Sequence, residues 1–217
     1  MKKIAVLTAL LFAALQIGYA QKVGLVLSGG GAKGAAHIGV IKALEENGIP
    51  IDYITGTSAG AIVGSLYAMG YTPEEMVELM LSEEFSYWQT GTVENEYKYY
   101  FKRPDPTPEF GHFSIDMTDS LQVKASFLPQ SLINPIQMNQ AFMALFSQAT
   151  AKAGWNFDNL FVPFRCVASD IYSKKAIIFK NGDLGDAVRA SMTFPFFFQP
   201  IWKDSVPIFD GGIYDNF

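Results

Sequence analysis

The sequence predicts an α/β fold with three layers, α/β/α, around a mainly parallel central sheet that carries a nucleophile elbow. Two observations lead to this class. Short apolar runs alternate with helical patterns over residues 23–81, and this order of strands and helices is typical of a parallel sheet covered by helices. In addition, a serine flanked by glycines joins the second predicted strand directly to a helix at residues 56–60.

The first of these alternating elements is the apolar run 23–27, which ends at a cluster of glycines and indicates a short buried strand. Apolar residues then recur at helical spacing up to Asn47-Gly48, where the glycine suits the position just after a helix. A strand is expected at 51–55 and an apolar helix at 61–69. Thr72-Pro73-Glu74-Glu75 provides an N-cap, a first-turn proline and a capping-box glutamate for a further helix.

The middle of the chain is harder to assign. Residues 85–135 contain an aromatic stretch and a proline cluster, and we interpret them as an irregular insertion with room for a hairpin. The aromatic part, 85–101, is either a packed insertion with ordinary exposed tyrosines, which is the favoured interpretation, or a lid or membrane-facing flap. Beyond it, elements are expected at 137–151 (helix), 161–168 and 176–179 (strands), 184–192 (helix) and 206–209 (strand).

The first twenty residues have the pattern of an export signal. Lys2 and Lys3 precede the apolar run 4–15 and the small residues of Gly18-Tyr19-Ala20. The run is shorter than the ~20 residues that a membrane-spanning helix needs. We therefore expect an exported protein, located in the periplasm, at the outer membrane or in the medium, whose mature domain begins at residue 21.

Charge and composition exclude several classes of protein. Removal of the signal moves the net charge from −5 to −7, which argues against nucleic acid as a partner because phosphate binding needs a basic face. Aromatic residues make up 14% of the chain, so it is not a disordered protein. Cys166 is the single cysteine and lies in an apolar run, which indicates a buried inert thiol. One cysteine and two histidines are too few to form a zinc site without scattered carboxylates, so no metal is expected, and no other cofactor is expected either.

The first glycine-rich turn, Gly29-x-Gly31-x-x-Gly34, has the spacing of a dinucleotide-binding turn, and Asp52 follows about twenty residues later. Three interpretations stay open: a plain tight turn, a nucleotide site, or an anion site made by N–H groups at a helix N-terminus. The position of Asp52 argues against the nucleotide. A ribose-binding acid belongs at the end of the second strand, whereas Asp52 stands at its start.

The second turn, Gly56-Thr57-Ser58-Ala59-Gly60, is a G-x-S-x-G nucleophile elbow. Small residues two positions before and after the serine, Gly56 and Gly60, let the strand fold back sharply into the helix. The serine is thereby exposed at the C-terminal edge of the sheet. We predict that Ser58 is a nucleophile; the alternative is that it only caps the helix.

A nucleophilic serine needs a base, and this chain has no histidine after His112. His37, on the first helix, and His112, in the insertion, are interpreted as structural or solvated. A carboxylate must then accept the proton, and Asp210 is the best candidate because it ends an apolar strand and precedes two glycines. A dry pocket that raises its pKa above ~3.9 would help.

The first glycine turn is then expected to lie beside the elbow, because both turns follow the C-terminal ends of adjacent strands. The N–H groups of Gly29, Gly30 and Gly31 are expected to stabilise a tetrahedral oxyanion, each donor contributing ~3 kcal/mol. Aromatic residues also gather near the C-terminus and form either core or the wall of an acyl-chain pocket. They are Phe194, Phe196, Phe197, Phe198 and Trp202.

Three motifs in this order resemble the signatures of the patatin-like phospholipase family, in particular its exported bacterial type: SGGGAKG at 28–34, GTSAG at 56–60 and DGG at 210–212. The resemblance covers nearly all of residues 22–217. It implies a lipid acyl hydrolase with a Ser–Asp dyad, in which Ser58 is the nucleophile and Asp210 the base. It also implies a glycine-rich oxyanion loop and no metal.

We therefore expect a serine hydrolase that cleaves carboxylic esters of phospholipids or related lipids, with a lipid as substrate and a membrane surface as a candidate partner. Two alternatives stay open: an exported lipid-binding module without turnover and, with less support, a nucleotide-binding enzyme that uses the first glycine turn. Residues 21–217 are expected to form an incomplete domain. Family members usually continue beyond this point, and some exported bacterial relatives continue into an outer-membrane barrel.

Overall fold

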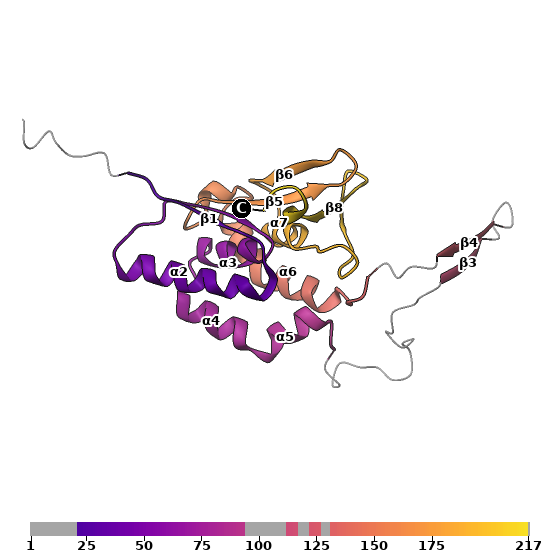
Figure 1. Ribbon diagram of the computed structural model, residues 1–217, viewed down its shortest axis with the longest axis horizontal. Coiled ribbons are helices and arrows are strands. Elements are labelled where there is room, and N and C mark those ends of the chain that lie inside the picture. Colours follow the sequence, from indigo (N-terminus) through magenta and orange to yellow (C-terminus); the bar gives the residue numbers. More distant parts are fainter. Residues whose placement is uncertain (1–20, 94–111, 117–121, 127–130, 217) are drawn as a thin grey trace, which may run out of the picture.

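The computed structural model describes residues 21–93, 112–116, 122–126 and 131–216, and the predicted export signal lies outside these ranges. The described residues contain a six-stranded sheet in the order β1-β2-β5-β8-β7, with β6 paired to β5 (Figure 1). Its strands are β1 (Gly24–Leu27), β2 (Tyr53–Thr57), β5 (Phe164–Asp170), β6 (Lys175–Phe179), β7 (Ile201–Lys203) and β8 (Val206–Asp210).

The described helices follow the chain order that the sequence predicted, with the helix Glu83–Thr90 as an addition to it. They are α2 (Ala35–Glu46), α3 (Ala59–Ala68), α4 (Pro73–Leu81), α5 (Glu83–Thr90), α6 (Ile136–Lys152) and α7 (Leu184–Ser191). The described ranges also contain the short 3-10 turns η1 (Gly31–Gly34), η3 (Phe157–Asn159) and η4 (Gly211–Ile213). Within the described residues, no helix is long and apolar enough to cross a membrane.

One predicted boundary and one predicted segment differ from the structure. The second strand begins at Tyr53 rather than residue 51, because the Asp52 carboxylate first accepts the Val23 N–H at 2.7 Å. The start of the insertion is not irregular, since residues 83–90 form α5. Ser82 caps this helix by accepting the Phe85 N–H at 3.2 Å, and Gly91 ends it with a left-handed φ of 68°.

The hairpin for which the insertion had room is present. Strands β3 (His112–Asp116) and β4 (Gln122–Ser126) pair antiparallel in a two-stranded sheet of their own. The strand β7 was not predicted, because three residues are too few for a periodicity to be recognised.

The main core lies between the sheet and the helices on one of its faces. On α3, Gly64 packs so closely against Ile54 and Phe164 that a Cβ there would collide with Ile54. Helices α2, α4 and α5 lie on the side of α3 away from the sheet (Figure 1). By the alternation of a strand, Val26 and Tyr53 point to the opposite face, where each is about half exposed. The described residues thus supply the sheet and the helices of one face.

Cys166 belongs to this core, as predicted. It is fully buried in the centre of β5, and burial raises the pKa of its thiol well above the usual range. A thiol that stays protonated at physiological pH is a poor nucleophile and a poor metal ligand. Cys166 is therefore an inert packing residue.

The central strand β5 determines which segments of the chain meet. Strand β2 runs parallel to it and pairs up to Thr57 opposite Val167, whereas β8 runs antiparallel and ends with Asp210 opposite Ala168. Both occupy the same edge of β5, because β6 takes the other edge along Cys166–Asp170. The two strands therefore approach each other end to end. The residue that follows β2 and the residue that ends β8 are thereby brought side by side.

The capping box at the start of α4 allows a test of local stability. Thr72 accepts the Glu75 N–H at 3.2 Å, and Glu75 accepts the Thr72 N–H at 2.8 Å. We expect Thr72→Ala to lower the free energy of unfolding by about 1 kcal/mol and Thr72→Ser to leave it nearly unchanged, measured by denaturant unfolding. Equal loss in both variants would contradict the capping explanation.

Candidate active site

Ser58 lies at the sharp turn between β2 and α3 in a strained conformation. Its φ of 54° and ψ of −120° fall outside the regions that non-glycine residues normally adopt. The surrounding backbone holds it there. Its N–H donates to the Ser191 hydroxyl at 3.0 Å, and its carbonyl accepts the Ala61 N–H at 2.9 Å.

The predicted elbow glycines, Gly56 and Gly60, lie where the backbone folds back on itself. A Cβ on Gly56 would collide with the backbone of Gly60, and a Cβ on Gly60 would collide with the carbonyl group of Leu27. Both contacts are with rigid backbone, so neither could relax by turning a side chain. The turn that exposes Ser58 therefore requires glycine at both positions.

Asp210 lies beside Ser58 at the end of β8, with 5% of its surface exposed. Its carboxylate accepts the Gly212 N–H at 2.7 Å. Burial raises the pKa of the Asp210 carboxyl, and the Ser58 side chain and the Gly212 N–H oppose the rise without cancelling it. Because its own N–H donates to the Thr193 carbonyl at 2.8 Å, the backbone at this position is also fixed.

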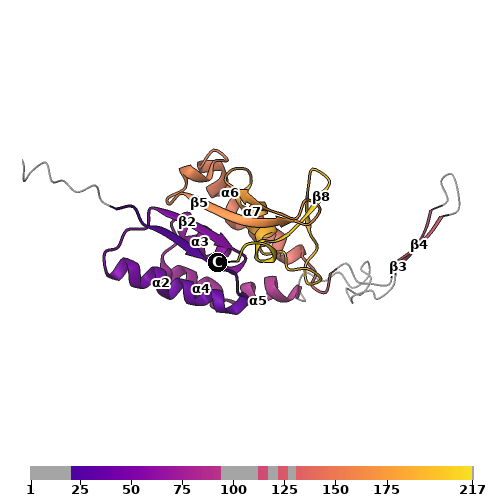
Figure 2. The same cartoon turned by 45° about the horizontal axis from the view of Figure 1, so that its top comes forward.

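The glycine turn after β1 completes the arrangement. Gly29 lies against the nucleophile elbow, since a Cβ on it would come within 3.0 Å of the Ser58 Cβ. Its N–H, however, donates to the Asn216 side chain at 2.8 Å. Of the three predicted oxyanion donors, Gly30 and Gly31 are the two whose N–H groups have no acceptor among the described residues. Figure 2 shows the segment after β8 returning to the first half of the chain, where this contact forms.

These groups face one cavity of about 670 Å³, which we call the site cavity. Ser58, Asp210 and the three glycines line it, together with Met192, Phe194, Phe197, Phe198, Gly212, Ile213 and Asn216. The structure thus brings together the predicted nucleophile, the predicted base and the three glycines of the first turn. Among the aromatic residues singled out near the C-terminus, Phe196 and Trp202 do not line the cavity and are exposed.

The remaining candidates have structural roles or lie elsewhere. The Nε2 atom of His37 lies 2.9 Å from the Ser28 carbonyl oxygen, and this contact joins α2 to the start of the glycine turn. Asp52 accepts the Val23 N–H at the start of β2, away from the turns, so this acid is not placed to hold a ribose. His112 begins the separate β3. In the part of the chain that is described, no three histidine, cysteine or acidic residues are grouped to hold a metal ion.

Two buried side chains that support the site were not identified from the sequence. The Ser191 hydroxyl donates to the Val167 carbonyl at 2.5 Å while it accepts the Ser58 N–H, so it links the elbow to β5. Arg189 donates to the Thr193 hydroxyl at 2.6 Å and to the Gln199 carbonyl at 3.2 Å, and so holds the loop that carries the cavity phenylalanines. Burial lowers the pKa of its guanidinium to about 10, which leaves it charged at neutral pH. Nothing local to either residue signals these roles.

An α/β sheet with a strained serine on a strand-to-helix turn, beside a buried aspartate, defines the class of α/β proteins with a nucleophile elbow. Comparison with known families narrows the class. The model described as "Patatin-like phospholipase" matches residues 25–217, and the chain belongs to this family.

Curated relatives agree with the family assignment. The chain is 31% identical over 197 residues to "Lysophospholipase NTE1" of Pyricularia oryzae, and 30% identical over 198 residues to "Patatin-like phospholipase domain-containing protein 6" of Mus musculus. The alignments cover 90% and 89% of this chain but only 11% and 12% of those proteins. The chain therefore corresponds to a small part of these relatives.

Among solved structures, VipD from Legionella pneumophila is similar in fold. The TM-score is 0.55 at 18% sequence identity, and the match covers 90% of this chain and 47% of VipD. This likeness confirms the predicted fold class, the three-layer α/β/α type with an open sheet. In this chain, the parallel part of that sheet is formed by β1, β2 and β5.

The hydrogen bonds of Ser191 lead to a prediction. Ser191→Ala removes the acceptor of the Ser58 N–H and the donor to Val167 within a buried region. We expect the free energy of unfolding to fall by about 1–3 kcal/mol, the usual cost of leaving a buried polar group unpaired, and Ser58 to react more slowly with a fluorophosphonate.

The matched control is Ser65→Ala. Ser65 is an equally buried serine on α3 whose hydroxyl bonds only the Ile62 carbonyl of its own helix. It should leave the labelling rate of Ser58 unchanged. Unaltered labelling in both variants would show that Ser191 does not position the elbow.

Proposed function

We propose that this chain is a serine lipid acyl hydrolase that cleaves carboxylic esters of phospholipids, lysophospholipids or related lipids. The observation that carries the proposal is the meeting of Ser58 and Asp210 in one cavity, next to free N–H groups of a glycine turn. Membership of the patatin-like family and the name of the fungal relative, a lysophospholipase, support a lipid ester as substrate.

The chemistry follows from the positions of these groups. The Ser58 hydroxyl oxygen attacks the ester carbonyl carbon, and its proton passes to the Asp210 carboxylate. The N–H groups of Gly30 and Gly31 would bind the negative oxygen of the tetrahedral intermediate. When the bond to the alcohol breaks, Asp210 returns the proton to the leaving oxygen. A water molecule, deprotonated by Asp210 in the same way, then releases the fatty acid from Ser58.

A carboxylate can act as this base because its environment makes it more basic. An exposed aspartate has a pKa near ~3.9 and is a weak proton acceptor at neutral pH. Burial raises the pKa of Asp210, which strengthens it as a base, while the Gly212 N–H and the Ser58 side chain oppose this rise. The balance of these effects suits a direct Ser–Asp pair.

The rim of the site cavity supports action at a lipid surface. Phe194, Phe197 and Ile213 line the cavity and remain about half exposed. Apolar side chains around the entrance of a site can contact the acyl region of a membrane or a micelle from which the substrate is taken. We also propose that the protein is exported, on the pattern of residues 1–20.

The assignment of Ser58 is tested by covalent labelling. A fluorophosphonate probe should label the wild-type chain, and Ser58→Ala should abolish the labelling. Ser86→Ala, at an exposed serine of α5, is the matched control and should be labelled like the wild type. Mass spectrometry of the adduct should place the label on the tryptic peptide that contains Ser58. Equal labelling of the Ser58→Ala variant would reject the assignment.

The assignment of Asp210 is tested by activity and by stability together. Asp210→Asn should lower ester turnover by about 10²–10⁴-fold, the usual contribution of a general base. In the wild type, kcat/KM should fall as the pH drops through the raised pKa of Asp210, because the base must be ionised.

Asp210→Asn should lower activity but raise the free energy of unfolding at pH 7. A carboxyl whose pKa is higher in the folded than in the unfolded state stabilises the fold while it is protonated, at a pH below the ordinary pKa. This stabilisation is lost as the pH rises through the folded-state pKa. Asp210→Asn should therefore be more stable than the wild type at pH 7. Asp170 is the control, because hydrogen bonds from Ser173 lower its pKa. Asp170→Asn should be less stable at pH 7, and reversed signs would contradict the electrostatic account.

A further inference from the structure

A second cavity, of about 440 Å³, also reaches Ser58. It lies among α3, α4, α5 and α6 and shares Ser58, Gly31, Met192 and Phe198 with the site cavity. We call it the helix cavity. Asp210, Gly212 and Asn216 line the site cavity and are absent from the helix cavity. Ser58 therefore stands where the cavity that contains the Asp210 carboxylate meets a second cavity that does not.

The walls of the helix cavity are apolar. Its deeper lining includes Ile62, Met80, Phe85, Trp88, Met138 and Phe142. Of the described residues, none that lines it is charged, and Gln89 supplies the single side-chain amide among them. A charged or strongly polar group would lose its hydration there without gaining hydrogen-bond partners. A hydrocarbon chain has no such hydration to lose, and its removal from water is favourable.

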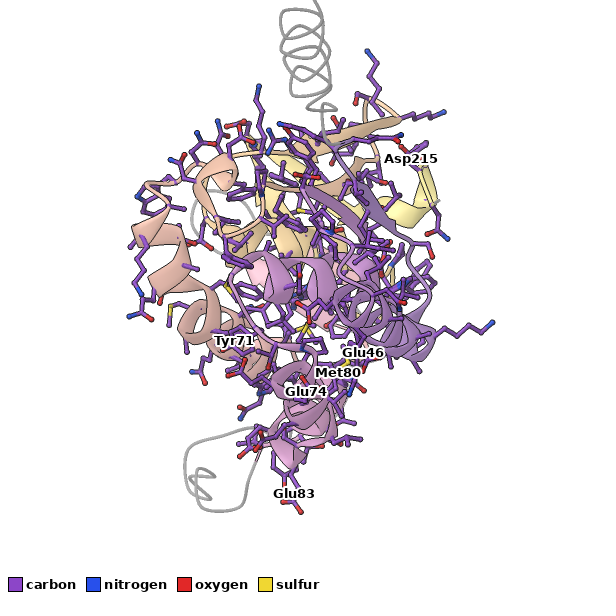
Figure 3. The ribbon with its side chains drawn as sticks, turned by 90° about the vertical axis from the view of Figure 1, so that its left-hand side faces the viewer. Glu46, Tyr71, Glu74, Met80, Glu83 and Asp215 are labelled. Atoms are coloured by element: carbon purple, nitrogen blue, oxygen red, sulfur yellow. The ribbon has the colours of Figure 1, made fainter. Side chains whose placement is uncertain are left out.

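The side chains that form these walls come from helices that also pack on the core. Phe85 and Trp88 stack edge to face with ring centroids 5.6 Å apart, and so form a firm aromatic side. Two methionines, Met80 and Met138, contribute flexible thioethers that adapt to the shape of a bound chain. Figure 3 shows Met80 within the group of helices, whereas Glu83 lies at the outer tip of the molecule.

The reaction assigns opposite parts of the ester to the two cavities. The leaving alcohol oxygen must lie near Asp210, which returns the proton to it, so the alcohol part belongs in the site cavity. The acyl part continues from the other side of the carbonyl carbon. Building on the proposed function, we infer that the helix cavity binds the single unbranched acyl chain of the ester under attack.

This assignment corrects one expectation from the sequence. The phenylalanines near Pro195 were candidates for the acyl-chain wall. Phe198 lines both cavities, but Phe194 and Phe197 line only the cavity that contains Asp210 and are half exposed. They surround the alcohol part and the entrance. The acyl specificity is determined instead by α4 and α5, of which α5 was not predicted as a helix at all.

Chain length provides the first test. Each methylene buried in an apolar cavity should raise kcat/KM about fourfold, until the cavity is full. We would measure p-nitrophenyl esters from acetate to palmitate with the full chain. A profile that rises with chain length and then flattens is expected. A profile that is flat from acetate onward, with clear turnover, would overturn the acyl site while leaving the proposed hydrolase intact.

A matched pair of variants assigns the effect to this cavity. Met80→Trp fills the helix cavity and should lower kcat/KM for decanoate esters at least tenfold, with less than a twofold change for acetate. Met143→Trp makes the same change at an exposed position of α6 outside the helix cavity and should alter neither. If Met80→Trp does not fold, Met80→Ala should move the optimum to longer chains. An unchanged chain-length profile in a folded Met80 variant would reject the inference.

A binding experiment separates this inference from catalysis. Trp88 is the tryptophan that lines the helix cavity; Trp155 and Trp202 are exposed and lie outside it. Titration with 12-bromododecanoate, whose bromine quenches nearby indole rings, should reduce the fluorescence, and Trp88→Phe should remove most of the quenching. Quenching without ester turnover would refute the proposed hydrolysis but support the chain site. Quenching that persists in Trp88→Phe would refute the site.

Discussion

The pairing of two strands along one edge of β5 is the constraint on which the site depends. Strand β2 arrives parallel and ends at Thr57, and β8 arrives antiparallel and ends at Asp210, opposite consecutive residues of β5. The opposed directions bring the ends of both strands to one point. The serine that follows β2 and the aspartate that ends β8 are thereby placed together, although about 150 residues of chain separate them. A shift of either register by one residue would turn one of the two side chains to the other face of the sheet.

Two locally unfavourable features sit at this point, and the surrounding core stabilises both. Ser58 has a strained backbone, and Asp210 carries a buried charge. The strain persists because Ser191 holds the Ser58 N–H and because the glycines of the elbow permit close backbone contact. The Gly212 N–H donates to this carboxylate, and it and the Ser58 side chain both lower the pKa against the effect of burial. Rigid packing around the site thus maintains a geometry that isolated segments of this chain would not adopt.

Features that depend on neighbours along the chain were predicted well. The elbow motif, the capping box of Thr72 and the buried character of Cys166 are all written in short stretches of sequence. Features that depend on distant partners were missed or only partly predicted. The contact of Asn216 with the Gly29 N–H removes one expected oxyanion donor, and the link from Ser191 to the elbow spans 133 residues. The helix α5 was missed because its aromatic residues show no clear period, and its N-cap and terminal glycine were overlooked.

The sequence by itself determined the class of fold, the nucleophile candidate and the base candidate, because glycine spacing, apolar runs and the shortage of histidine are local chemical facts. The tertiary structure alone decided which glycine N–H groups remain free, how burial changes the pKa of Asp210, and that two cavities, of which one contains the Asp210 carboxylate, meet at Ser58. These properties arise from groups far apart in the chain that share a small volume. Hydrogen-bond competition, desolvation and cavity shape exist only after the chain has packed.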